Sequence, residues 1–114
     1  MGMKFGLCLP HRWVYASPQS IAGMAWETEV LGYHFVWVAD HIPVPAHHSE
    51  RAHIFYEALA TFVFFSALIT RVQLGTNVLI ASTHQLALLA KQAKQLATPD
   101  WLSGGCLIVG VGVG

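Results

Sequence analysis

Residues 102–114 read Leu102-Ser103-Gly104-Gly105-Cys106-Leu107-Ile108-Val109-Gly110-Val111-Gly112-Val113-Gly114, a glycine turn followed by an apolar, strand-like run with evenly spaced glycines. Three earlier runs, at residues 3–9, 34–39 and 72–80, are similarly rich in branched apolar and aromatic side chains. Helix-like stretches separate the four runs, and strands that alternate with helices are typical of a parallel sheet. The sequence therefore predicts an α/β fold with about four parallel strands and three helices.

Local signals place the three helices. Ser17 is suited to an N-cap with Pro18 at the first helical position, and Gly32 is suited to end that helix. The second helix is expected at about residues 54–70 and is apolar nearly all round, so we expect it to be covered on more than one side. Ser82 or Thr83 is expected to cap a third, amphipathic helix that ends before Pro99.

Composition excludes several classes of partner. The chain has 114 residues, and its six basic and six acidic residues cancel without forming a basic patch, which argues against nucleic acid and anionic membranes. Only 11% of the residues are charged and 54% are hydrophobic, so part of the surface is expected to contact protein. The apolar segment at residues 54–69 is shorter than the roughly 20 residues of a membrane span and contains Glu57.

The N-terminus lacks the pattern of a signal peptide, so the expected location is the cytoplasm. Cys8 and Cys106 both lie in strands that we expect to be buried. Two cysteines in a chain that is not secreted make packed thiols the preferred interpretation over a disulfide.

Polar and glycine-rich segments lie at the carboxyl end of each predicted strand. These segments are Pro10-His11, Asp40-His41, residues 77–83 and residues 110–114. Because the carboxyl ends of parallel strands lie at one rim of a sheet, the segments are expected to converge although they are far apart in sequence. This rim is the predicted functional site.

Two of these segments suggest specific chemistry. His41 has a side chain that exchanges protons near neutral pH and Asp40 is suited to orient it, although such a pair also caps loops. Gly110, Gly112 and Gly114 would allow backbone amides to approach a phosphate or a flat ring, and tight strand packing is the equally simple alternative.

Other chemistries lack support. His47, His48 and His53 are not accompanied by the spaced ligands of a metal site, so we interpret them as part of a polar loop and expect no metal. The chain contains neither a Gly-x-Ser-x-Gly elbow nor a Walker loop, so acyl and phosphoryl transfer are not indicated.

Motifs along nearly the whole chain resemble those of the luciferase-like monooxygenase family, whose flavin and deazaflavin enzymes are built on a TIM barrel. The matching segments, in order, are residues 3–7 with Leu9-Pro10, Glu29 with residues 31–33, residues 36–41, 74–76, 78–79, 89–92, 96–98, 102–105 and 110–114. The resemblance implies that residues 1–114 form one partial domain, the N-terminal half of a (β/α)8 barrel, since a complete barrel takes about 250 residues.

The resemblance also implies an activity. The expected function is oxidation, reduction or oxygen insertion on a small organic substrate with FMN or coenzyme F-420 as cofactor. His41 would be the active-site histidine beside the cofactor ring and Asp40 its positioning residue. Asn77 and Val78 would form the family's non-prolyl cis peptide behind the ring, and the segment Gly110, Gly112 and Val113 would contact the cofactor.

Departures from the family pattern leave an alternative open. Asn77 is bulkier than the usual residue, Pro99 and Trp101 stand at positions that usually suit a helix, and Cys106 stands where arginine is common. Half a barrel also leaves the edges of the first and fourth strands unpaired. We therefore expect either a homo-oligomer or a missing C-terminal half-barrel. The alternative function is a catalytically silent half-barrel that associates through its open edges.

Overall fold

The computed structural model describes residues 2–41, 56–83, 85, 87, 88, 91, 94, 97, 98, 101, 105 and 107–113. The elements follow in the order β1 (Gly6–Cys8), α1 (Pro18–Leu31), β2 (Phe35–Val38), α2 (Ala58–Ser66), β3 (Gln73–Ile80) and β4 (Leu107–Gly112). Short 3₁₀ turns occupy Trp13–Tyr15 and Ala81–Thr83. The predicted α/β alternation is confirmed, and each strand lies within its predicted run.

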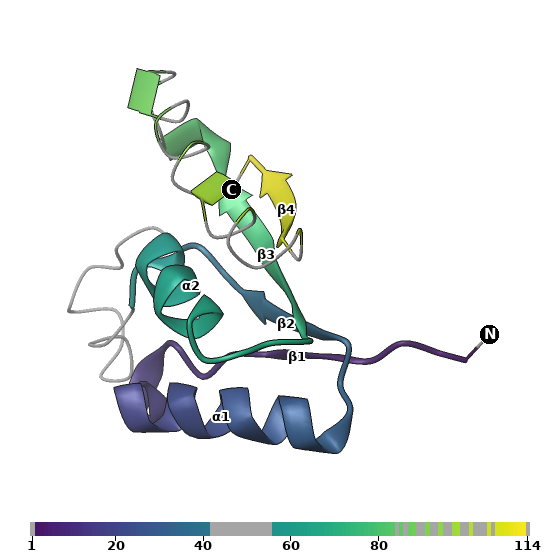
Figure 1. The fold of residues 1–114 in the computed structure, drawn as a ribbon. Coiled ribbons are helices and arrows are strands. Elements are labelled where there is room, and N and C mark those ends of the chain that lie inside the picture. Colours follow the sequence, from purple (N-terminus) through teal and green to yellow (C-terminus); the bar gives the residue numbers. More distant parts are fainter. Residues whose placement is uncertain are drawn as a thin grey trace.

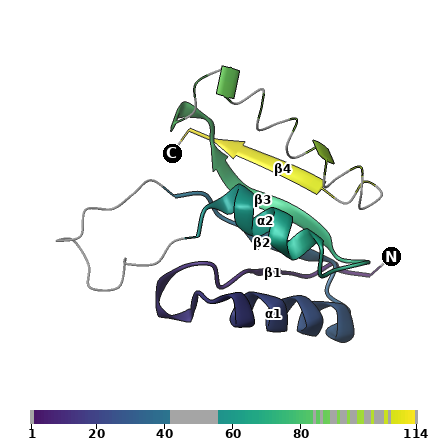
Figure 2. The same ribbon diagram turned by 60° about the vertical axis from the view of Figure 1, so that its left-hand side comes forward.

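All neighbouring strands are parallel, and their order in the sheet is β1-β2-β3-β4, the same as their order in the sequence. Figures 1 and 2 show α1 and α2 packed along this sheet, α1 beside β1 and α2 beside β2 and β3. A doubly wound sheet changes direction in its strand order and carries helices on both faces, whereas a barrel adds strands in sequence. The arrangement is therefore that of consecutive βα units of a TIM barrel.

The ends of α1 are set by the residues that the sequence indicated. The Ser17 hydroxyl oxygen accepts a hydrogen bond from the Ser20 amide at 2.9 Å, and Pro18 begins the helix. Gly32 ends it with φ of 79°, a left-handed conformation that glycine adopts without a steric cost. Both predicted boundaries of this helix are confirmed.

Helix α2 is shorter than predicted. Its N-cap is Glu57, whose carboxylate accepts hydrogen bonds from the amides of Leu59 and Ala60 at 3.0 and 2.7 Å. The helix buries one face, but Val63 and Phe64 remain 50% and 44% exposed. Within the part of the chain that the structure describes, the expectation that this helix is covered on more than one side is wrong.

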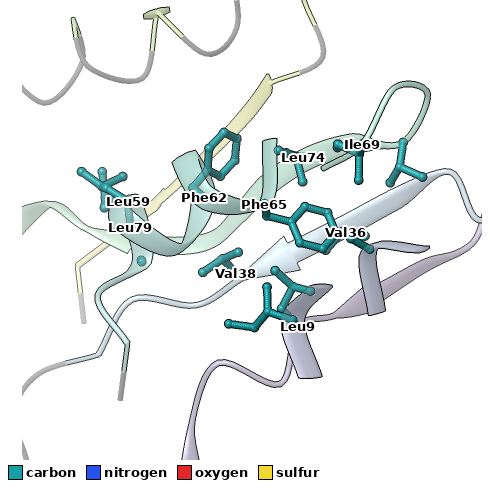
Figure 3. Close-up of a cluster of buried hydrophobic side chains, with 13 residues drawn as sticks. Leu9, Val36, Val38, Leu59, Phe62, Phe65, Ile69, Leu74 and Leu79 are labelled. Atoms are coloured by element: carbon teal, nitrogen blue, oxygen red, sulfur yellow. The ribbon is translucent and has the colours of Figure 1, made fainter. Parts of the chain in front are cut away.

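The core lies between the sheet and the two helices. Side chains that alternate along a strand point to opposite faces, so Val36 and Val38 of β2 both point to the helices and are fully buried. Figure 3 shows them with Phe62 and Phe65 of α2, which enter the same cluster. Burial of these large apolar side chains supplies the main stabilisation of the fold.

The opposite face of the sheet carries aromatic side chains and glycines. The Phe35 and Trp37 rings stack there at a centroid distance of 5.9 Å. A Cβ atom at Gly6 would lie 2.7 Å from the Trp37 indole nitrogen, and one at Gly75 would overlap the Trp37 ring. The indole thus lies across glycines of both neighbouring strands, which leave room for it.

The expectation that Cys8 is buried is wrong. It was predicted to be a packed thiol, but it is exposed. The reason is the strand alternation, because Cys8 lies two residues from exposed Gly6 while Leu9 next to it enters the core. Cys106 lies outside the described residues.

The third predicted helix lies mostly outside the described residues. Those that are described, at positions 87, 88, 91, 94, 97, 98 and 101, are helical and exposed. Among all described residues, none of the helices combines the length and hydrophobicity that crossing a bilayer requires.

Glu29 joins the end of α1 to the start of β3. Its carboxylate accepts hydrogen bonds from the amides of Thr70, Arg71 and Val72 at 3.0, 2.8 and 2.9 Å. The Arg71 guanidinium in turn donates to the backbone carbonyls of Glu29 and Tyr33. Partial burial raises the pKa of Glu29, but the three amides and the Arg71 charge outweigh it, so the pKa lies below its ordinary value.

Candidate functional site

Asp40 lies where β2 ends and connects that end to β3. Its amide donates to the Val78 carbonyl at 3.2 Å, and its Oδ2 accepts from the Ile80 amide at 3.1 Å. Its Oδ1 accepts from the His41 amide at 2.9 Å. Both carboxylate oxygens therefore contact backbone amides, which is the geometry of a residue that positions a turn.

His41 follows directly and is exposed at the same rim. Of the two interpretations of the Asp40-His41 pair, the structure supports the capping role for Asp40. This leaves His41 as the exposed member of the pair. The chain from Ile42 to Phe55, with His47, His48 and His53, lies outside the described residues.

β3 contributes the middle of the rim. The peptide bond between Asn77 and Val78 is cis, as the resemblance implied, and Asn77 is exposed while Val78 is half-buried. The β3–β4 ladder shifts register between Thr76 and Leu79. This irregularity coincides with the predicted site.

Thr76 bridges the irregular part of the ladder. Its hydroxyl donates to the Gly110 carbonyl at 2.9 Å and accepts from the Gly110 amide at 3.0 Å. The Thr76 side chain, only 1% exposed, therefore satisfies both backbone groups of Gly110. Thr76 lies within the family-like motif at residues 74–76, but this role was not predicted, because a hydroxyl group that replaces ladder hydrogen bonds has no signature in a single sequence.

The glycines of β4 have a packing function. A Cβ atom at Gly110 would overlap the Thr76 carbonyl oxygen, and one at Gly112 would lie 2.6 Å from a methyl group of Val78. The structure thus supports tight strand packing at both positions. The packing places Gly110 and Gly112 directly against the Asn77-Val78 segment.

Val113 completes the rim and is 87% exposed. Its carbonyl accepts a hydrogen bond from the Ser82 hydroxyl at 2.9 Å, which links the end of β4 to the turn after β3. Gly114 lies outside the described residues. The predicted site residues Asp40, Val78, Gly112 and Val113 are therefore connected by direct contacts or through Ser82.

His11, in the segment after β1, is a further polar residue at the rim. Its side chain is 2% exposed, and its backbone carbonyl accepts from the Tyr56 amide at 3.0 Å just before α2 begins. The sequence placed His11 at the rim but did not distinguish it from a loop residue. Nothing in its immediate neighbours signals burial.

Contacts link the described rim from β1 to β4, at the carboxyl end of parallel strands: His11 lies against the Ala39 carbonyl oxygen, Asp40 binds Val78, and Val78 packs against Gly112. This is the position at which TIM-barrel enzymes bind cofactors and substrates. Among the described residues, histidine, cysteine, aspartate and glutamate do not gather in groups of three or more that would hold a metal. The fold is thus that of the α/β-barrel class, whose enzymes carry out their chemistry at this rim.

Sequence comparison identifies the family within that class. Residues 3–114 match the luciferase-like monooxygenase family, and the chain belongs to it. Comparison with curated protein sequences finds no significant match. The predicted resemblance is therefore confirmed at the level of the family.

Solved structures agree with this assignment. A coenzyme F420-dependent tetrahydromethanopterin reductase from Methanopyrus kandleri is 25% identical, with a TM-score of 0.72, over 100% of this chain and 28% of that one. The monooxygenase RslO1 from Streptomyces bottropensis is 28% identical, with a TM-score of 0.69, over 96% of this chain and 32% of that one.

A Baeyer-Villiger monooxygenase from Pseudomonas putida, solved in complex with FMN, shares the fold at 14% identity and a TM-score of 0.75, over 99% of this chain and 30% of that one. The chain therefore spans about 30% of the length of these barrels, as the coverage of 28%, 32% and 30% shows.

Proposed function

We propose that this chain supplies the first four strands and the cofactor-binding rim of a flavin- or deazaflavin-dependent oxidoreductase that acts on a small organic substrate. The observation that carries the proposal is the contact set at the rim, in which Asp40 fixes the start of the His41 segment against β3. The same part of β3 packs against Gly112 of β4. Family membership, and the use of coenzyme F420 by one similar enzyme and of FMN by another, favour one of these two as the cofactor.

The residues at the rim fit a flat tricyclic ring with polar edges. Val78 is half-buried and Val113 is exposed, so both offer apolar surface. Exposed Asn77 and His41 offer polar groups beside it. When bound, a reduced flavin or deazaflavin supplies hydride transfer, or oxygen activation in the case of a flavin.

Each side chain has a distinct role in this proposal. His41 is the catalytic residue, whose imidazole exchanges a proton with the substrate or the ring. Asp40 is a positioning residue, because its two carboxylate oxygens accept hydrogen bonds from the His41 and Ile80 amides. The glycines of β4 keep that strand close to β3, so that Val113 reaches the rim.

The test is a fluorescence titration of the protein with FMN and with coenzyme F420. We expect saturable binding of one of them, weakened about tenfold by His41→Ala, which corresponds to the loss of roughly one hydrogen bond to the ligand. The matched control is His34→Ala, at the opposite end of β2, which should leave the affinity unchanged. Absence of binding by the folded protein would contradict the proposal and favour the alternative of a silent, self-associating half-barrel.

A further inference from the structure

His11 makes two hydrogen-bond contacts with acceptors of the same kind. Its ring Nδ1 lies 2.9 Å from the Leu9 carbonyl oxygen, and its Nε2 lies 2.8 Å from the Ala39 carbonyl oxygen. Leu9 follows β1 and Ala39 follows β2, so the ring joins the carboxyl ends of two strands. Both distances are in the range of good hydrogen bonds.

The two contacts require two donors. A backbone carbonyl oxygen only accepts hydrogen bonds, and a neutral imidazole has a single N–H group. In the neutral ring, one nitrogen would therefore direct its lone pair at a carbonyl oxygen within 3 Å. Only the imidazolium, with a proton on each nitrogen, satisfies both contacts.

His34, at the start of β2, offers the opposite case. Its Nδ1 lies 3.2 Å from the Phe5 amide, which is a donor. The Nδ1 of His34 must therefore keep its lone pair, and the ring must be neutral when this bond forms. The two histidines lie at opposite ends of β2 and are expected to differ in protonation.

We propose that His11 is a doubly protonated imidazolium that acts as a positioning residue, fixing the end of β2 from which Asp40 and His41 extend. Burying a charged ring costs free energy, and two short charge-assisted hydrogen bonds offset that cost. Among the residues that the structure describes, the charged and titratable groups on the elements that meet here are Cys8 of β1, Arg12 in the same segment as His11, Asp40 and His41 after β2, and Tyr56 and Glu57 at the start of α2.

The positioning effect follows from the order of residues along the chain. The carbonyl group that His11 binds belongs to Ala39, and the next amide is that of Asp40, which donates to Val78 of β3. The peptide unit that joins Ala39 to Asp40 is thus held from both sides, by β1 and by β3. An effect of His11 on cofactor affinity rests on the proposed function, but its effect on the order of this peptide unit does not.

The first experiment measures protonation in the unmodified protein by NMR with ¹⁵N-labelled histidine. At neutral pH we expect both ring nitrogens of His11 to carry protons, and the ring of His34 to carry one. A His11 ring with a single protonated nitrogen would overturn the proposal. This measurement needs neither a variant nor a cofactor.

The second experiment compares His11→Phe, which removes both donors and keeps a ring, with the matched control His34→Phe. In His11→Phe we expect amide exchange at Asp40 and Ile80 to rise about tenfold, as expected when a local hydrogen-bonded unit opens more easily. The control should leave both amides unchanged. Unchanged exchange in a folded His11→Phe protein would overturn the positioning role.

Cofactor titration of the same variants separates this proposal from the proposed function. We expect about tenfold weaker binding in His11→Phe than in His34→Phe. If neither the unmodified protein nor the variants bind FMN or coenzyme F420, the proposed function fails while the NMR and exchange results still decide the role of His11. If His11→Phe does not fold, His11→Gln, which keeps one donor nitrogen and has an acceptor oxygen in place of the other, replaces it in both measurements.

Discussion

Replacing Thr76 with valine removes a hydroxyl group while keeping the size and branching of the side chain. In the structure that hydroxyl makes two hydrogen bonds with Gly110, at 2.9 and 3.0 Å, where the β3–β4 ladder shifts register. The valine would place a methyl group against the amide and carbonyl of Gly110. The variant therefore tests whether this single side chain holds β4 against the Asn77-Val78 segment.

The expected loss of stability comes from the two polar groups that the change leaves behind, the amide and the carbonyl of Gly110. Each buried group left without its partner costs about 1–3 kcal/mol, a range that already includes the lost hydrogen bond. Because Gly110 is half-buried, the lower end applies, and we expect about 2–3 kcal/mol for Thr76→Val. Thr76→Ser keeps the hydroxyl and loses one methyl group, at a cost of about 1 kcal/mol.

The assay is urea unfolding followed by tryptophan fluorescence, with Thr28→Val as the matched control. Thr28 is also fully buried, but its hydroxyl donates within α1 to the Ala25 carbonyl, so its loss should cost about 1 kcal/mol. We expect Thr76→Val to be the least stable of the three variants. A Thr76→Ser protein as unstable as Thr76→Val would refute the argument, because packing rather than hydrogen bonding would then explain the effect.

Three further predictions follow from other contacts. The pKa of Glu29 is lower in the folded protein than its ordinary value of 4.5, so the ionised carboxylate stabilises the fold. This stabilisation is complete above pH 4.5 and is lost as the pH falls through the lower pKa of the folded state. In urea unfolding at a series of pH values, Glu29→Gln should therefore show a weaker loss of stability on the acid side. Gly110→Ala should lower the melting temperature more than Gly112→Ala does. The new Cβ atom at position 110 meets a backbone carbonyl of β3, whereas the one at position 112 meets a methyl group of Val78, which a side-chain rotation can move. Equal losses in the two variants would contradict this prediction. Ser17→Ala should cost about 1 kcal/mol in urea unfolding through loss of the N-cap, and Ser17→Asp should recover most of it.

Much of the fold is predictable from local sequence signals. The cap at Ser17 and the stop at Gly32 place α1 to the residue because capping depends on the few residues at each end. The limits of α2 were less predictable, since its apolar sequence continues beyond the helix. The exposure of Cys8 was missed because alternation along a three-residue strand does not reveal which face meets the helices.

The candidate site was predictable in position but not in detail. Parallel strands bring their carboxyl ends to one rim, so Asp40, Val78 and Gly112 were expected near one another, and their contacts follow that rule. The roles of Thr76 and His11 were not predictable, because each depends on a hydrogen bond to the backbone of another strand. Such bonds depend on strand register, which a single sequence leaves open.

The indole of Trp37 occupies a volume that three adjacent strands share, since it lies against Gly6 of β1 and Gly75 of β3. The size of the Trp37 side chain therefore limits the size of the residue that can stand at Gly6 and at Gly75. An alanine at Gly6 or Gly75 should be tolerated only together with a smaller residue at Trp37, and related sequences should change at these three positions together. The same contact makes Trp37 an intrinsic spectroscopic probe of whether β1, β2 and β3 remain assembled.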